Sequence, residues 1–151
     1  MLNPIRVRGQ ILIRATPEEV WDLVENPGAA MGLLPKGAHV DLLTDRFDQV
    51  GSRWRVVTQS GQARAEILNE VLAIEKPVSQ VLRSTSDRMT GGSRTTLTAT
   101  DGGTLMVVEA TAEFPPGLRS ILDRILTAIL GPISTRRALT RMKRLIEAGS
   151  A

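Results

Sequence analysis

Few side chains in this sequence are suited to covalent or acid–base catalysis. The 151 residues include one histidine, His39, and no cysteine or tyrosine. A serine nucleophile needs a base within hydrogen-bond reach, and the nucleophile-elbow motif GxSxG does not occur. A zinc site without cysteine needs several histidine and carboxylate ligands, which one histidine cannot supply. We therefore expect no metal and no cofactor, we interpret His39 as an ordinary residue at the entry to a strand, and the sequence assigns no catalytic residue.

The carboxylate pairs are explained by secondary structure rather than by proton transfer. The acidic residues of the first predicted helix complement its cap and its dipole. Two further pairs, Glu66 with Glu70 and Glu109 with Glu113, project from strand faces opposite the apolar residues. We predict that both pairs are solvated.

Three residues are more promising as binding groups. Asn69 alternates with the apolar residues Ile67 and Val71, so its amide is predicted to be buried and to need partners. A neighbouring strand side chain is the favoured partner, and a ligand carbonyl or hydroxyl is the alternative. Trp54, if it points inward, would pack against a ligand, with a plain core tryptophan equally favoured. If a bulge reverses the register of this strand, Arg55 points into the cavity instead of Trp54 and could bind the acidic head group of a ligand.

The charge pattern is weak evidence for nucleic-acid binding. The formal net charge is +3, although the sequence pI is about 10.2. With no tyrosine or cysteine and one histidine, little titrates between the carboxylates and the arginines, so a small arginine excess raises the pI. A basic cluster lies near the end of a predicted helix, where it complements the dipole, and an anionic partner is the less favoured interpretation. The cluster comprises Arg136, Arg137, Arg141, Lys143 and Arg144.

Length and composition predict one domain over residues 1–151 in the cytoplasm. The lack of cysteine fits a reducing compartment, and the N-terminus shows no export signal. Charged residues at Arg119, Asp123 and Arg124 argue against a membrane span.

The chain begins with a strand and a helix. Residues 5–13 alternate between apolar and polar side chains, which indicates a strand with one covered face. The sequence TPEE at residues 16–19 combines an N-cap threonine, a proline at the first helical position and a glutamate at N3. Asn26-Pro27-Gly28 ends that helix, and a second short helix is predicted after it.

Six further strands are predicted between residues 39 and 114, joined into an antiparallel meander. They cover residues 39–44, 52–59, 62–74, 78–88, 93–100 and 104–114. The breaks are residues 48–51, 60–61, 76–77, 91–92 and 101–103, which are rich in glycine, proline and aspartate.

The remaining segment, residues 115–148, is predicted to be a long helix that covers the sheet. Its apolar residues between Leu118 and Ile133 span about half of the helix circumference, which leaves a homodimer contact open. A second apolar set, from Leu139 to Ile146, is rotated by roughly 150° from the first. Gly131-Pro132 lies between the two sets, so we predict a kink or break there.

This order of elements resembles the START-like superfamily, which includes the polyketide cyclase/dehydrase and lipid-transport proteins with the helix-grip fold. The residues that carry the resemblance are ILIRATPEEVWDLV at 11–24, GSRW at 51–54, EKP at 75–77 and GGT at 102–104. The resemblance implies an α+β fold with a seven-stranded curved antiparallel sheet wrapped around a long C-terminal helix, and two short helices after the first strand. It also implies a cavity for a lipid, polyketide-like or other hydrophobic molecule. The charge pattern disfavours nucleic acid as a partner.

We predict that this cavity lies between the sheet and the C-terminal helix. Small residues such as Ala63, Ala65, Ala110 and Ala112 favour an open interior. The predicted lining is Trp54, Arg55, Ile67, Asn69, Leu82, Leu97, Met106, Val108, Ala110 and Phe114 from the sheet, with Leu118, Leu122, Ile125 and Ile129 from the helix.

A carrier or sensor of a hydrophobic molecule is the favoured function, and it has two alternatives. The first is a cyclase, aromatase or dehydratase that uses Arg55 or Asn69 to polarise a carbonyl. It is disfavoured because two Trp, two Phe and no Tyr leave few groups to orient planar substrates or move protons. The second is a co-chaperone or ribosome-associated interaction module that uses the basic cluster.

Overall fold

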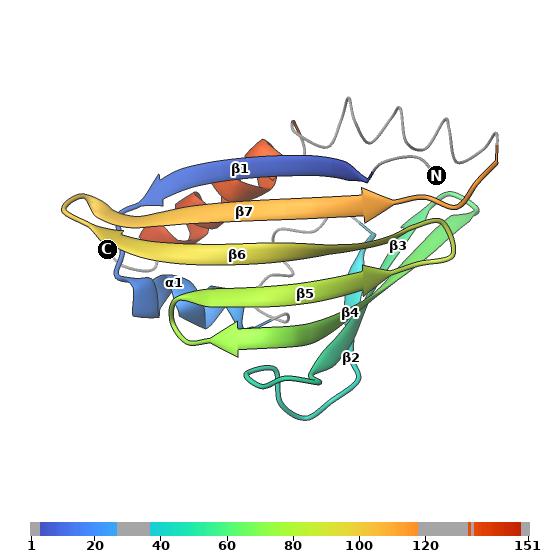
Figure 1. Cartoon of the computed structure of the whole chain (residues 1–151), viewed down its shortest axis with the longest axis horizontal. Helices are drawn as coiled ribbons and strands as arrows, with labels where there is room; N and C mark the ends of the chain where they lie inside the picture. Colours follow the sequence, from blue (N-terminus) through green and yellow to red (C-terminus); the bar gives the residue numbers. More distant parts are fainter. Residues whose placement is uncertain (1–3, 27–36, 118–132, 134, 149–151) are drawn as a thin grey trace.

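The computed structural model describes residues 4–26, 37–117, 133 and 135–148. Seven antiparallel strands form one curved sheet in the order β1-β7-β6-β5-β4-β3-β2, so β1 and β2 are its edges (Figure 1). The chain adds each strand from β2 to β7 beside the previous one, as a meander does, and β7 then pairs with β1. The elements are β1 (Ile5–Ile13), α1 (Pro17–Val24), β2 (His39–Leu42), β3 (Arg53–Ser60), β4 (Ala63–Glu75), β5 (Ser79–Thr85), β6 (Thr90–Thr100) and β7 (Gly103–Glu113).

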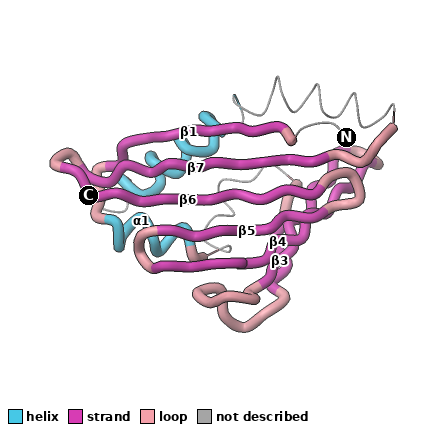
Figure 2. The backbone as a smooth tube through the Cα atoms, in the orientation of Figure 1, coloured by secondary structure: helices cyan, strands magenta, loops and turns pink. Residues whose placement is uncertain are grey.

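One face of the sheet, called the covered face below, packs against the helices. Figure 1 shows α1 and the C-terminal helical segment, residues 135–148, behind the strands. They meet the sheet in one core cluster, in which Trp21 of α1 and Leu139 of the C-terminal segment join Ile13, Leu97 and Met106. The opposite face, called the outer face, carries charged residues such as Arg8 and Glu109 (Figure 2 gives the strand paths).

The first helix begins where the sequence predicts. Thr16 is the N-cap, Pro17 follows it, and the backbone N–H of Glu19 donates to Thr16 Oγ1 at 3.3 Å while the backbone N–H of Thr16 donates to Glu19 Oε2 at 2.9 Å. This capping box satisfies two of the orphan N–H groups that every helix start exposes. Trp21 is fully buried, and its indole N–H donates to Glu25 Oε2 at 2.8 Å.

The C-terminal helical segment is attached to β1 by close packing and by two polar contacts. Gly9 makes the approach feasible, because a Cβ at that position would lie 2.9 Å from both Leu139 Cδ1 and Thr135 Cγ2. The ammonium of Lys143 donates to the backbone oxygen of Leu12 at 2.8 Å. Glu147 Oε1 accepts from the backbone N–H of Arg14 at 3.0 Å. The predicted second short helix and the predicted kink at Pro132 lie outside the described residues.

The prediction of a turn at Gly91-Gly92 is wrong, because both glycines lie inside β6. The turn falls earlier, where Ser86 Oγ accepts from the backbone N–H groups of Arg88 at 3.2 Å and Met89 at 3.1 Å. This serine-centred turn ends β5 at Thr85, short of the predicted residue 88. Gly91 is needed for a close approach instead, since a Cβ there would lie 2.2 Å from the backbone oxygen of Thr111.

One buried hydroxyl ties the sheet to the start of α1, and its removal should be costly. Thr104 is fully buried, and its Oγ1 donates to the backbone oxygen of Ala15 at 2.7 Å. Thr104→Val keeps the shape but leaves that carbonyl unpaired, so we expect a loss of about 1–3 kcal/mol in the free energy of unfolding, measured by urea denaturation. The matched control Thr98→Val, on an exposed position of β6, should change it by less than about 0.5 kcal/mol. Equal effects of both substitutions would contradict this role for Thr104.

Candidate ligand-binding face

A continuous row of side chains crosses the covered face away from the helical core cluster, and we name it the Trp54 row. Its members are directly opposite one another on successive strands. They are Leu42, Trp54, Asn69, Ser84, Gly91, Ala112 and Ile5. Apolar groups stand at its two ends and polar or very small groups at its middle. The row therefore combines apolar surface with hydrogen-bonding groups, which is the usual make-up of a small-molecule site.

Asn69 is buried at 9% exposure, as its alternation with Val71 predicts. Ser84 Oγ donates to Asn69 Oδ1 at 2.7 Å across the β4–β5 pair. The favoured interpretation, a neighbouring strand side chain as partner, is thus confirmed for the amide oxygen. The contact holds the amide plane in one orientation on the covered face.

Trp54 is 8% exposed and stands directly opposite Asn69. Phe47, from the loop before β3, meets it edge to face, with ring centroids 6.1 Å apart and an interplanar angle of 71°. This is a favourable geometry for aromatic rings, because the positive ring edge of one faces the negative ring face of the other. The indole is therefore fixed as a rigid apolar wall at this end of the row.

Arg55 lies on the outer face, on the opposite side of β3 from Trp54. The β3–β4 register runs without a break from Arg53 to Ser60, and the irregularity in β4 comes between Val71 and Ala73, beyond the paired stretch. The condition that would turn Arg55 inward is therefore not met. Its Nε lies 3.9 Å from Glu66 Oε2 in a half-exposed ion pair, which is worth little in stability.

Most of the other predicted lining residues share the covered face with Trp54, by the same register. Leu97 and Met106 belong to the core cluster, with Val108 packed against it. Phe114 follows the end of β7, and Ala65 is exposed near the start of β4. Ile67, Leu82 and Ala110 are partly buried. Leu118, Leu122, Ile125 and Ile129 lie outside the described residues.

Two buried polar groups on the covered face were not singled out from the sequence. Gln80 is 3% exposed and Ser52 is 2% exposed, and neither Gln80 Nε2 nor Ser52 Oγ has a hydrogen-bond partner among the described residues. The signal for Gln80 is its position two residues before Leu82, because alternate residues of a strand share a face. A polar residue on the same strand face as a predicted cavity residue is a candidate for the lining of the same cavity.

Three charged side chains with displaced pKa values lie in the loops around β2 and between β4 and β5. A hydrogen bond from Arg46 lowers the pKa of Asp48, and the same contact raises the pKa of Arg46. A hydrogen bond to Glu25 at 2.9 Å raises the pKa of Lys76. Each shift stabilises the charged form of its group, so these are salt-bridge effects at the surface and do not create a poised acid or base.

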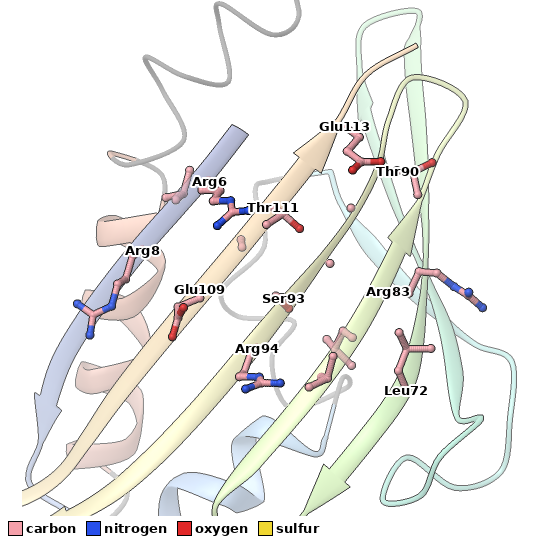
Figure 3. Close-up of a pocket in the computed structure, with 16 residues that line it drawn as sticks. Arg6, Arg8, Leu72, Arg83, Thr90, Ser93, Arg94, Glu109, Thr111 and Glu113 are labelled. Atoms are coloured by element: carbon pink, nitrogen blue, oxygen red, sulfur yellow. The ribbon is translucent and has the colours of Figure 1, made fainter. Parts of the chain in front are cut away.

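A hollow of about 660 Å³ lies against the outer face of the sheet. Figure 3 shows side chains of both charges around it, among them Arg6, Arg8, Arg94 and Glu109. Its openness to solvent and its mixed charge are typical of a solvated sheet face. All of its charged side chains lie on the face opposite Trp54 and Asn69, so it is distinct from the predicted cavity. Its boundary also includes Val7, Leu82, Gly91, Ser93 and Ala110, which the register assigns to the covered face.

Metal and membrane signals are absent from the part of the chain that the structure describes. His39 is exposed, with Nε2 3.6 Å from Asp41 Oδ1, and among residues 4–26, 37–117, 133 and 135–148 no three metal-ligating side chains gather. Within the same residues, no helix has the length and hydropathy to cross a bilayer.

A curved seven-stranded antiparallel sheet with a C-terminal helix packed on one face defines the helix-grip class of α+β proteins. The family model for polyketide cyclase / dehydrase and lipid transport matches residues 4–147. The chain therefore belongs to this family, and the resemblance to START-like proteins is confirmed. No curated protein matches the sequence.

Solved structures share the fold at low sequence identity. TTHA0849 from Thermus thermophilus is 19% identical with a TM-score of 0.79, covering 97% of this chain and 100% of its own. A Staphylococcus aureus protein of unknown function, SA2116, is 11% identical with a TM-score of 0.76, covering 98% of this chain and 96% of its own. CV1439 from Chromobacterium violaceum is 16% identical with a TM-score of 0.71, covering 95% and 99%. At these identities the likeness shows the fold alone.

A double-mutant cycle should detect the Asn69–Ser84 contact. Asn69→Ala and Ser84→Ala together should cost less than the sum of the single substitutions, with a coupling of about 1 kcal/mol in the free energy of unfolding. The matched control is Glu70 with Arg83, an ion pair on the same two strands but on the outer face. Its coupling should be under about 1 kcal/mol and should fall in 1 M salt, where roughly 3 Å is the screening length. Additive effects at Asn69 and Ser84 would contradict the contact.

Proposed function

We propose that this protein binds a small hydrophobic molecule between the covered face of its sheet and the C-terminal part of the chain. The observation that carries the proposal is the small size of the side chains that β6 and β7 place in the Trp54 row and next to it. Gly91, Ser93, Ala110 and Ala112 follow one another there, and each is paired with another member of the set across the two strands. Protein interiors are close-packed, so small residues in the middle of a covered sheet leave room for a guest.

The proposed lining joins this region to the apolar residues predicted from the sequence. Trp54, Ile67, Leu82 and Val108 supply apolar walls from the sheet. The predicted contribution of the C-terminal part comes from Leu118, Leu122, Ile125 and Ile129. Membership of a family described by polyketide cyclisation, dehydration and lipid transport supports a ligand of this class.

Carrier or sensor activity fits the described polar groups better than catalysis does. The covered face carries neutral hydroxyl and amide side chains, among them Ser52, Asn69 and Gln80. Such groups orient a ligand by hydrogen bonds but do not exchange protons near neutral pH. The one charged candidate for polarising a carbonyl, Arg55, lies on the outer face.

The interaction-module alternative also has less support than carrier function. Lys143, a member of the basic cluster, contacts Leu12 and lies 3.6 Å from Glu147, so it helps attach the helix to β1. Arg136, Arg137 and Arg144 are exposed on the same segment, as expected for charged side chains on a solvated helix surface.

Native mass spectrometry of protein purified from its own host should reveal a bound hydrophobic molecule that is lost on denaturation. Ala110→Trp should lower the bound fraction at least about tenfold, because the indole fills space beside Ser93 and Val7 on the covered face. The adjacent substitution Thr111→Trp, on the outer face, should leave the bound fraction unchanged.

Circular dichroism and urea unfolding of both variants check that each is folded. An empty wild-type protein, or equal loss of the guest in both variants, would contradict binding at this face.

A further inference from the structure

The side-chain amide of Gln80 is a buried donor without a partner among the described residues. It is 3% exposed, and its Nε2 forms no hydrogen bond with any described residue. A buried polar group left unpaired costs about 1–3 kcal/mol, so native structures rarely keep one without a reason. An amide on a sheet face could easily be replaced by an apolar residue of the same size, which would remove that cost.

The position of Gln80 is central on the covered face. It lies on β5, the fourth of seven strands in the sheet order. It stands opposite Ile74 on β4 and Thr95 on β6, and two residues before Leu82 on the same face. Ile74 packs against the helical core cluster. On the other side of Gln80 along β5, Leu82 is followed two residues later by Ser84, a member of the Trp54 row. Gln80 is thus at the boundary between the packed core and the proposed ligand region.

The chemistry of Nε2 restricts which groups can form a hydrogen bond with it. A primary amide nitrogen donates hydrogen bonds and accepts none, so its partner must offer a lone pair. Carbonyl and carboxylate oxygens are the strongest acceptors that a small hydrophobic molecule commonly carries. Ser52 Oγ is a second buried group on this face with no partner among the described residues. The backbone N–H of Val71 donates to the backbone oxygen of Ser52 at 2.9 Å, and Val71 stands opposite Leu82, so β4 lies between Ser52 and β5.

We propose that Gln80 Nε2 donates a hydrogen bond to a carbonyl or carboxylate oxygen of the bound ligand, and that Gln80 selects oxygenated hydrophobic molecules over hydrocarbons. This inference rests on the proposed function and specifies the ligand class for the same face. Gln80 acts as a specificity-determining contact. Ser84 already satisfies the amide oxygen of Asn69, whereas no described residue accepts a hydrogen bond from Gln80 Nε2.

The test uses two probes of nearly equal size and shape, 2-acetylnaphthalene, which carries a ketone, and 2-ethylnaphthalene, which does not. Isothermal titration calorimetry on delipidated full-length protein should show about tenfold tighter binding of the ketone, equivalent to 1.4 kcal/mol. Gln80→Met, which keeps the length but removes the donor, should abolish this preference while leaving the affinity for 2-ethylnaphthalene within about twofold. The control Gln59→Met, at an exposed position of β3, should keep the preference.

Stability of the ligand-free protein separates a ligand contact from a structural one. Gln80→Met should leave the midpoint of urea unfolding unchanged or raise it, because it removes an unpaired buried group. A lower midpoint would show that Gln80 is bonded within the protein and would overturn the inference. Equal binding of the two probes by the wild type would overturn it too, while the proposed function would stand. Failure of both probes to bind would contradict the proposed function and the inference together.

Discussion

The side-chain alternation along seven antiparallel strands is the constraint on which this protein depends. Because the period is two, the backbone register decides for every residue whether it faces the helices or the solvent. A slip of one residue in β3 would exchange Trp54 for Arg55 on the covered face. The unbroken pairing of Arg53–Ser60 with β4, and of Leu42 with Trp54, prevents that exchange. The same register places Asn69 beside Ser84 and gathers the charged residues on the outer face.

Holding this register requires close approaches that only glycine allows. Gly91 lets β7 pass within contact of β6, and Gly9 lets the C-terminal helical segment lie directly on β1. Lys143 and Glu147 then bind backbone groups of β1 and of the residue that follows it. The helix is thereby tied to one edge of the sheet, so the core cluster forms at that side. The Trp54 row and Gln80 are left with fewer helical neighbours among the described residues.

The periodic features could be predicted from the sequence because they depend on local chemistry. The capping box at Thr16, the alternation in β1 and β7, and the burial of Asn69 follow from residue types at fixed spacing. Gly91-Gly92 was misassigned because a glycine pair resembles a turn, whereas its role depends on the backbone of β7, which is distant in sequence. Gln80 was missed for a similar reason. Whether its amide has a partner depends on the neighbouring strands β4 and β6 and on what covers the face, which no local sequence pattern predicts.

The proposed ligand face must leave room and a hydrogen-bond donor for a ligand, and the folded protein must stay stable without that ligand. Small residues and an unpaired amide lower the stability of the empty protein, since both forgo packing or hydrogen bonds that a filled core would make. The capping box, the buried Thr104–Ala15 hydrogen bond and the core around Trp21 lie away from the Trp54 row, at the helical core cluster of the same face, and supply stability independently of the ligand. Natural proteins keep such locally unfavourable features mainly at functional sites. A bound ligand would supply the packing and hydrogen bonds that the empty face lacks. A ligand that binds only the folded state also stabilises it, by an amount that grows with the logarithm of the ligand concentration over Kd. On the proposed function, such a face would favour ligands that supply both apolar surface and an acceptor oxygen over those that supply only one.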